Sequence, residues 1–266
     1  MTRISGTNII KTPCCGALLS MPSYSSINFM AWEYWTDGHA EGSLAPPGDG
    51  LRRCICGECF VIYSPKLELV RSTRHSKPIA PIGWSTRRDN WITRAFGRES
   101  RDEVRERYDV RPVEEIELER IFVPPSPGYV SRDELKQLAD SQIVDPEVAM
   151  TVRRLYWRHL NESHRDVFRT FREAHKEEVN ADGTSSTFPP FEPSAEQVLN
   201  IEKLCQLLES ADSPRWLEIA ELRRELADFS GAAEALTHIE GEKERLHLVV
   251  DRLVTMKVQG PVRYYF

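Results

Sequence analysis

The sequence predicts an α+β protein in which a small β unit that carries cysteines precedes an all-α array. Three observations support this prediction. Five of the six cysteines lie between Cys14 and Cys59. A β-favouring run over residues 26–35 leads into Asp37-Gly38, a dipeptide typical of two-residue hairpin turns with positive φ at both positions. From residue 129 onward, apolar residues recur at the three- and four-residue spacing of helices that bury one face.

The composition is that of an ordinary globular chain of 266 residues. Apolar residues make up 40% and charged residues 29%, and the formal net charge is −6. No apolar run approaches the ~18 residues of a membrane span, so we expect none. The first residues lack the apolar core of a secretory signal, and we expect a cytoplasmic protein. The first 100 residues carry a net charge of +4 and the rest −10, which suggests two units with different surfaces.

We expect three regions along the chain. Residues 1–63 form a β unit with the cysteines and an aromatic β-hairpin, whose strands lie near 26–35 and 39–44. Residues 64–128 are rich in proline and in charges of alternating sign, which predicts a linker. Residues 129–266 form an α-helical domain. Asp145-Pro146 and the capping box Ser194-Ala195-Glu196-Gln197 mark the starts of two of its helices.

Two similar loops carry the strongest chemical signal. They are Thr12-Pro13-Cys14-Cys15-Gly16 and Cys54-Ile55-Cys56-Gly57. In each, a second cysteine precedes Cys-Gly, and the glycine lets the backbone curl around the sulfurs. Two such loops supply the four thiolates that tetrahedral Zn²⁺ accepts. The pattern resembles the zinc-ribbon family with its rubredoxin-like knuckles, over residues 12–63. The resemblance implies a structural metal site on a small β-hairpin fold.

The cysteine spacing departs from the usual C-x-x-C-G pattern, which would place ligands at Thr12 and Arg53. Neighbouring side chains also tend to diverge, which makes ligation by adjacent cysteines awkward. The preferred ligands of a structural Zn²⁺ are Cys14, Cys15, Cys54 and Cys56. Cys59 is the alternate to Cys14, because it forms a regular C-x-x-C with Cys56, and His39 is a weaker substitute. Two other interpretations stay open, namely buried free thiols and a disulfide pair in a secreted chain.

The sequence contains no motif that indicates catalysis. It has no His-Glu-x-x-His string, no glycine-rich phosphate loop and no G-x-S-x-G. We therefore expect no catalytic residues, no cofactor-binding residues and no enzymatic activity. The carboxylates are expected on solvated helix faces, and Cys205 in a helical core. A polar and aromatic patch is either a functional surface or the cover of a packed helix pair: Trp157, Arg158, His159, Asn161, His164 and Arg165.

One helical segment, residues 216–236, resembles a single tetratricopeptide repeat. Trp216 and Leu226 match apolar positions of its first helix, and Phe229 and Ala232 match the positions where the second helix crosses. Ala227 stands where a glycine is usual. The resemblance implies a tetratricopeptide-like array that binds peptides or partner helices, and a plain helical bundle is the equally open alternative.

These observations predict a zinc-stabilised protein-interaction (adapter or scaffold) protein. Its protein partner would bind the helical domain or the hairpin aromatics Trp32, Tyr34 and Trp35. The layout also resembles bacterial proteins of unassigned activity that combine a Cys-Cys-Gly ribbon, a Tyr-Trp-Thr-Asp-Gly segment and a helical tail. The alternative is a nucleic-acid-binding protein that uses the ribbon and its neighbouring basic residues: Arg52, Arg53, Arg71, Arg74, Lys77, Arg87 and Arg88.

Overall fold

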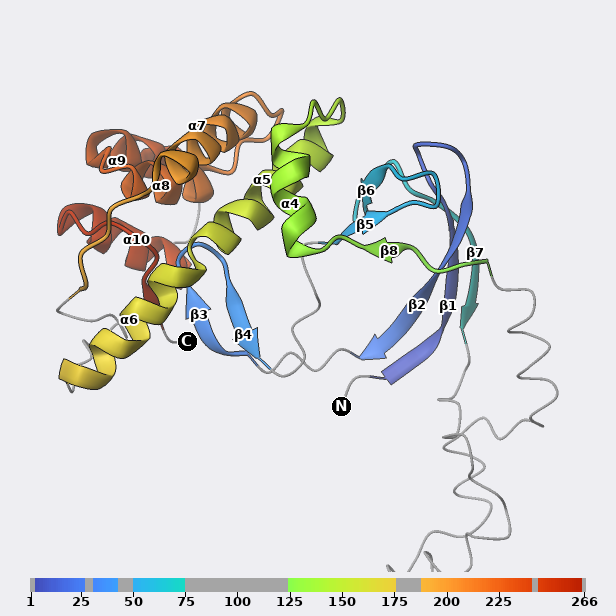
Figure 1. The fold of residues 1–266 in the computed structure, drawn as a ribbon, viewed down its shortest axis with the longest axis horizontal. Helices are drawn as coiled ribbons and strands as arrows, with labels where there is room; N and C mark the ends of the chain where they lie inside the picture. Colours follow the sequence, from blue (N-terminus) through green and yellow to red (C-terminus); the bar gives the residue numbers. More distant parts are fainter. Residues whose placement is uncertain are drawn as a thin grey trace, which may run out of the picture. The chain divides into compact units, whose positions relative to one another are not determined.

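The computed structural model describes residues 3–26, 31–42, 50–74, 124–175, 188–240 and 244–264. Small antiparallel sheets and a C-terminal helical region confirm the predicted α+β class (Figure 1). The chain divides into two compact units. The cysteine unit comprises Met1–Asn28 and Arg52–Tyr129, and the helical unit comprises Phe29–Leu51 and Val130–Phe266. Within the described residues, no helix is long and apolar enough to cross a membrane.

The cysteine unit contains two three-stranded antiparallel sheets. In the first, β1 (Arg3–Lys11) lies between β2 (Leu18–Ser26) and β7 (Glu68–Arg74). In the second, β5 (Leu51–Arg53) lies between β6 (Cys59–Val61) and β8 (Gly128–Tyr129). A small apolar core is formed by Ile10, Leu19, Cys54 and Phe60. A core of this size buries little apolar surface, so such a unit commonly needs a cross-link or a metal.

Strand β7 lies inside the stretch that the sequence predicts as a linker, residues 64–128. It pairs with β1, and Lys11 and Glu68 form an ion pair at 3.1 Å between the two strands. Leu69 and Val70 are exposed on β7. The strand therefore buries little apolar surface and leaves a weak periodic signal in the sequence. Residues 75–123 of the expected linker lie outside the described residues.

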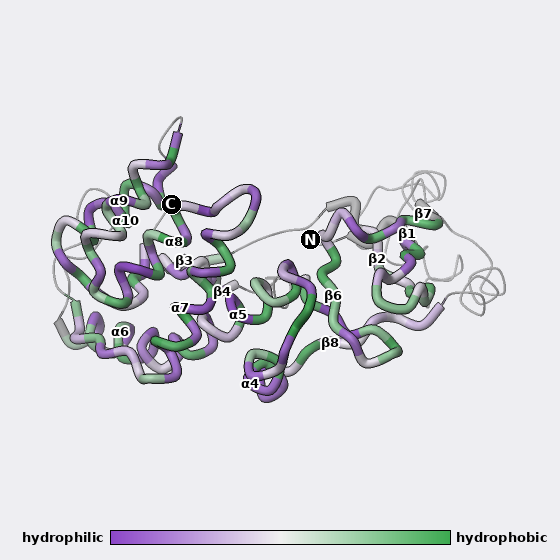
Figure 2. Tube along the Cα trace, turned by 90° about the horizontal axis from the view of Figure 1, so that it is seen from above, coloured by the Kyte–Doolittle hydropathy of each residue, from purple (hydrophilic) through white to green (hydrophobic). Residues whose placement is uncertain are grey.

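The helical unit contains helices α4 (Arg132–Asp140), α5 (Pro146–Leu160), α6 (Glu162–His175), α7 (Ala195–Glu209), α8 (Trp216–Glu225), α9 (Phe229–Thr237) and α10 (Arg245–Thr255). Both predicted starts are confirmed. The Asp145 side chain caps α5, and Ser194 forms a capping box with Gln197 at α7. Apolar and polar residues alternate along the helices (Figure 2). The apolar residues meet in a core that includes Cys205, as predicted.

The aromatic hairpin belongs to the helical unit. The sequence pattern predicts it in the cysteine unit. Its strands, β3 (Ala31–Trp35) and β4 (Ala40–Gly42), form a sheet with β9 (Arg263–Tyr264) near the C-terminus. Trp35 is fully buried, and its ring meets that of Phe168 edge-on with centroids 5.3 Å apart. Pairing between β3 and β9 spans more than two hundred residues, so no local sequence pattern indicates it.

The hairpin turn differs from the predicted two-residue turn. The Trp35 N–H donates to the His39 carbonyl at 2.9 Å, which makes Thr36, Asp37 and Gly38 a three-residue loop. Of the three, only Gly38 has a positive φ, +74°. This backbone conformation favours glycine; a Cβ at Gly38 would lie 2.6 Å from Nη2 of Arg158, the end of a flexible side chain that would have to shift.

The placement of the hairpin generates a stability prediction. Trp35→Ala removes a fully buried side chain from the cluster with Phe168 and Leu253. We expect it to lower the free energy of unfolding of the helical unit by about 3–5 kcal/mol. Urea unfolding followed by the helical circular dichroism signal measures this loss. Val167→Ala, at a side chain that is 51% exposed on α6, is the matched control. An unchanged helical transition in Trp35→Ala would contradict the assignment of the hairpin to the helical unit.

Candidate metal centre

Two strand connections of the cysteine unit position the predicted ligands. The first connects β1 to β2, and the second connects β5 to β6. The glycine N–H of each loop donates back to the residue that opens it, from Gly16 to the Thr12 carbonyl at 3.0 Å and from Gly57 to the Cys54 carbonyl at 2.9 Å. Both glycines have positive φ, +71° and +95°, a conformation in which a side chain is strained. The sequence expectation that glycine curls these loops is thereby confirmed.

The two loops bring together the four sulfurs of Cys14, Cys15, Cys54 and Cys56. All four Sγ atoms lie within 4.8 Å of one another. The Cys15–Cys54 and Cys14–Cys56 pairs are each 3.5 Å apart, and each joins one loop to the other. A tetrahedral zinc with Zn–S bonds of ~2.3 Å places its sulfurs about 3.8 Å apart. The four side chains therefore have the number, the chemistry and the approximate spacing of a Cys₄ site.

Thr12 explains why adjacent cysteines take part in the group. It holds the same place in its loop as Cys54 in the other, because each residue accepts the hydrogen bond of its loop glycine. The buried Thr12 hydroxyl lies 3.7 Å from Sγ of Cys15 and 3.5 Å from Sγ of Cys54. Thr12 thus contributes a hydroxyl where the usual pattern has a cysteine. The following Cys14 supplies the fourth sulfur.

The alternate candidates lie outside this group. Cys59 begins β6 and is not one of the four residues whose sulfurs gather. His39 follows the hairpin turn of the helical unit. The six cysteines all carry free thiols, so none of them is paired in a disulfide.

The close sulfurs also shift one another's ionisation. Burial opposes the Cys54 thiolate, but the Cys56 backbone N–H, the Thr12 hydroxyl and the neighbouring thiols stabilise it and lower the pKa of Cys54 to about 6. Burial and the thiols of Cys56 and Cys54 raise the pKa of Cys14 to about 12. The Cys54 thiolate is thus favoured, and its charge opposes ionisation of Cys14.

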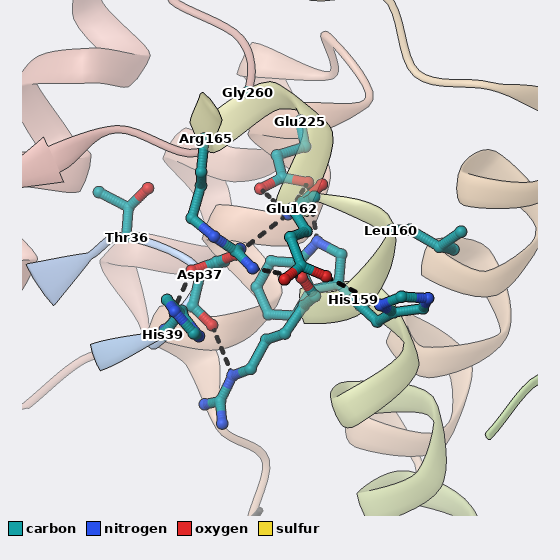
Figure 3. A network of polar contacts seen from close by, with 12 residues as sticks. Thr36, Asp37, His39, His159, Leu160, Glu162, Arg165, Glu225 and Gly260 are labelled. Atoms are coloured by element: carbon teal, nitrogen blue, oxygen red, sulfur yellow. Dashed lines mark hydrogen bonds and ion pairs between the residues drawn. The ribbon is translucent and has the colours of Figure 1, made fainter. Parts of the chain in front are cut away.

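A second concentration of polar groups lies inside the helical unit, around the hairpin turn. Asp37 is buried, and its carboxylate accepts hydrogen bonds from Arg165 at 2.5 Å and from Asn161 at 3.3 Å (Figure 3). Its backbone carbonyl accepts a third from Arg158 Nε at 3.0 Å. The turn of the hairpin is therefore fixed to the break between α5 and α6.

Three further ionisable residues extend the same network. Glu225 is fully buried and accepts hydrogen bonds from Trp157 Nε1 at 2.8 Å and from Asn161 Nδ2 at 3.1 Å. The buried Arg224 pairs with Glu221 at 2.6 Å and donates to the Gly260 carbonyl, also at 2.6 Å. Burial, followed by repulsion from Glu221 and Asp37, raises the pKa of Glu225 to about 8. At neutral pH Glu225 is therefore mainly protonated.

The network includes three of the six residues of the polar and aromatic patch around Trp157. Its members Trp157, Asn161 and Arg165 cover and join the packed α5–α6 pair, which is the second of the two predicted alternatives. Asp37, Glu221 and Glu225 were missed as members, because carboxylates were expected on solvated faces. Their only sequence signal is weak: Glu221 and Glu225 lie four residues apart on α8, and they share the helix with apolar Ile219 and Leu222.

Comparisons of the chain with protein-family models, with curated proteins and with solved structures found no match to any of them. Functional inference therefore starts from the side-chain geometry described above.

The buried carboxyl of Glu225 generates a pH prediction. Its pKa is about 8 in the folded chain and near 4.5 when solvated, so the folded state holds this proton more tightly. The resulting stability is complete below about pH 4.5 and is lost as the pH rises through about 8. We expect Glu225→Gln, which mimics the neutral acid, to flatten this decline in the free energy of unfolding.

Urea unfolding of parent and variant at several pH values between 5 and 9 measures the effect. Glu234→Gln, at a side chain that is 73% exposed on α9, should leave the decline as it is in the parent. The pKa values of His39 and His164 are lowered by burial, and both residues remain in all three proteins. The difference between variants therefore isolates Glu225. An identical pH profile in parent and Glu225→Gln would contradict the assignment.

Proposed function

We propose that the protein is a zinc-stabilised adapter without catalytic activity of its own. The observation that carries the metal part is the group of four cysteine sulfurs within 4.8 Å of one another. Cys14 and Cys15 would hold the ion from the first loop, and Cys54 and Cys56 from the second. The bound Zn²⁺ supplies a cross-link between two segments that are far apart in sequence.

The donor set favours a structural over a catalytic role for the metal. Four thiolates complete the tetrahedral coordination of zinc and leave no position for water or substrate. The group of potential ligands consists of cysteines only. A small apolar core around Ile10, Leu19 and Phe60 lies beside it and gives the cross-link a clear stabilising purpose. The finer proposal is a zinc ribbon with two unusual knuckles, in which Cys14 is adjacent to Cys15 and Cys54 is one residue removed from Cys56.

The adapter part of the proposal is supported by the helical unit. Its α8–α9 pair spans the segment that resembles a tetratricopeptide repeat, and we propose a tetratricopeptide-like arrangement for it. Ala227, between the two helices, has a φ of +61°, the conformation that the usual glycine of such repeats favours. Side chains such as Leu199 on α7 and Leu248 on α10, each 51% exposed, offer apolar contacts of the kind that protein interfaces use.

One observation favours nucleic-acid binding as a second candidate. In the cysteine unit, the Arg52 guanidinium lies 4.6 Å from the ring centroid of Tyr129, and Tyr129 is 66% exposed. Exposed rings beside cations are the elements on which single-stranded nucleic acids stack. The side chains of Arg71 and Arg74, and the whole of Lys77, Arg87 and Arg88, lie outside the described residues. The adapter remains the better supported of the two.

The metal proposal predicts about one zinc ion per purified full-length chain, in line with a Cys₄ site. Cys15→Ser and Cys56→Ser should each lose the ion, because three thiolates hold zinc more weakly. Cys59→Ser and Cys205→Ser should retain it and serve as matched controls. Elemental analysis by mass spectrometry together with thiol counting measures both. A parent protein without zinc whose thiols all react in the folded state would contradict the proposal. If Cys14→Ser retains zinc and Cys59→Ser loses it, the fourth ligand is Cys59 and not Cys14.

The adapter proposal predicts a protein partner that binds the full-length chain in nuclease-treated cell extract. Leu199→Glu and Leu248→Glu should weaken capture, because each introduces a charge on an exposed apolar side chain. Ala233→Glu, on the exposed surface of α9, is the control. Quantitative proteomics of the captured fraction measures the effect. Capture that disappears with nuclease and falls steeply with salt would instead support the nucleic-acid candidate.

A further inference from the structure

A cavity of about 350 Å³ lies within the helical unit, between the end of α4, the first half of α5 and the second half of α7. Part of its wall is apolar, from Ile143, Ala149 and Leu207. Another part is polar or charged, from Arg153, Lys203 and Gln206. This volume accommodates a small molecule. None of these residues belongs to the cysteine group or to the network around Asp37.

Helical spacing explains why these side chains share one cavity. Ala149 and Arg153 are four residues apart on α5, and Lys203 and Leu207 are four apart on α7, so each pair occupies one helix face. Asn200, one turn before Lys203, joins the two helices. Its Oδ1 accepts from Arg153 Nη1 at 3.3 Å, and its Nδ2 donates to the Arg153 carbonyl at 3.0 Å. The Arg153 guanidinium is thereby held in a defined position.

Arg153 differs from its neighbours in making no direct ion pair with a carboxylate among the described residues, although Asp140 acts on it from a longer distance. Arg154, next in the chain, pairs with Glu218 at 2.5 Å, and Arg132 on α4 pairs with Glu162 at 2.7 Å. Arg153 instead makes two hydrogen bonds to neutral acceptors, the Asn200 amide and the Ala139 carbonyl at 2.9 Å. A guanidinium has five N–H donors, so most of its capacity is left over.

The surroundings reinforce the demand for a negative charge. Burial lowers the pKa of Arg153, and the opposing influence of Asp140 is smaller. Lys203 adds a second cation to the same cavity wall. A half-buried cation that Asp140 compensates only in part is unfavourable, and an anion bound beside Arg153 and Lys203 relieves the cost.

We propose that this cavity binds a small ligand with one carboxylate and a short apolar body. The carboxylate is bound by the Arg153 guanidinium and the Lys203 ammonium, and the apolar body packs against Ile143, Ala149 and Leu207. The proposal depends on neither the metal nor the adapter role.

A carboxylate fits this site better than a phosphate. Phosphate groups favour helix N-termini, where free backbone N–H groups point at the anion. The helix ends at this cavity are the C-terminal ends of α4 and α7, which carry partial negative charge. At the N-terminus of α5, Pro146 has no N–H and the next one is capped by Asp145. Asp140 acts on Arg153 and offsets one of the two positive charges, so the net charge of +1 is balanced by a monoanion and not by a dianion.

Titration of the full-length protein with three probes tests the proposal, followed by protein-observed NMR. N-acetyl-L-leucine carries a carboxylate and an apolar body, N-acetyl-L-leucinamide is its neutral counterpart, and inorganic phosphate is an anion without an apolar body. We expect the first to bind with a dissociation constant on the order of millimolar, as its small size allows. Binding should shift signals of residues 139–153 and 200–210 and weaken with added salt. The amide and phosphate should each bind about tenfold more weakly or not at all.

Variants identify the charges responsible. Arg153→Gln should weaken N-acetyl-L-leucine binding about tenfold or more, and Lys203→Gln, at an exposed side chain that folding tolerates, several-fold. Arg132→Gln removes an equal charge from an exposed ion pair on α4 and should leave the affinity unchanged. Equal binding of acid and amide, or unchanged affinity in both Arg153→Gln and Lys203→Gln, overturns the proposal. Absence of binding by N-acetyl-L-leucine overturns it as well. Phosphate binding that is stronger than N-acetyl-L-leucine binding would contradict a carboxylate ligand and indicate a phosphate ligand.

Discussion

The helical unit depends on the buried ion pair between Asp37 and Arg165. Both side chains are almost completely withdrawn from solvent, at 0% and 4% exposure. Removal of either partner would leave an uncompensated charge in the interior, which is far more costly than the net gain from forming the pair. The pair fixes the turn of the β3–β4 hairpin to the helices, and the β3 strand then pairs with β9 at the end of the chain. Segments from three distant parts of the sequence are thereby held together.

This anchoring constrains the cysteine unit through the covalent chain. The chain leaves the cysteine unit after Asn28, forms the hairpin of the helical unit and returns at Arg52. The two cysteine loops therefore lie on either side of the hairpin in the sequence, with 38 residues between Cys15 and Cys54. A metal bound by both loops would join the two ends of the chain segment that contains the hairpin. Closure of a loop of this length restricts the unfolded chain, which is one physical reason for a cross-link at this point.

Charge balance explains the unusual state of Glu225. Around the hairpin turn, three buried carboxyl groups face two buried guanidinium groups: Asp37, Glu221 and Glu225 against Arg165 and Arg224. Two ion pairs can form, and the remaining carboxyl group is more stable when it is neutral. Among the described residues, Glu225 accepts its hydrogen bonds from uncharged donors and not from a guanidinium, since its partners are the Trp157 indole and the Asn161 amide. Uncharged donors stabilise a carboxylate less than a cation does, so the proton stays on Glu225.

Local sequence patterns were sufficient to predict the features whose signals are local. The capped starts of α5 and α7 and the curled cysteine loops follow from residues within a few positions of one another, and the likeness of the two loops predicts that their cysteines gather. Tertiary structure alone decided the unit to which the hairpin belongs, the pairing of β7, the burial of Asp37 and Glu225, and the cavity beside Arg153. Each of these depends on contacts between residues far apart in the chain. Periodicity and turn chemistry report which face of an element is apolar, but they carry no information on which distant element covers it.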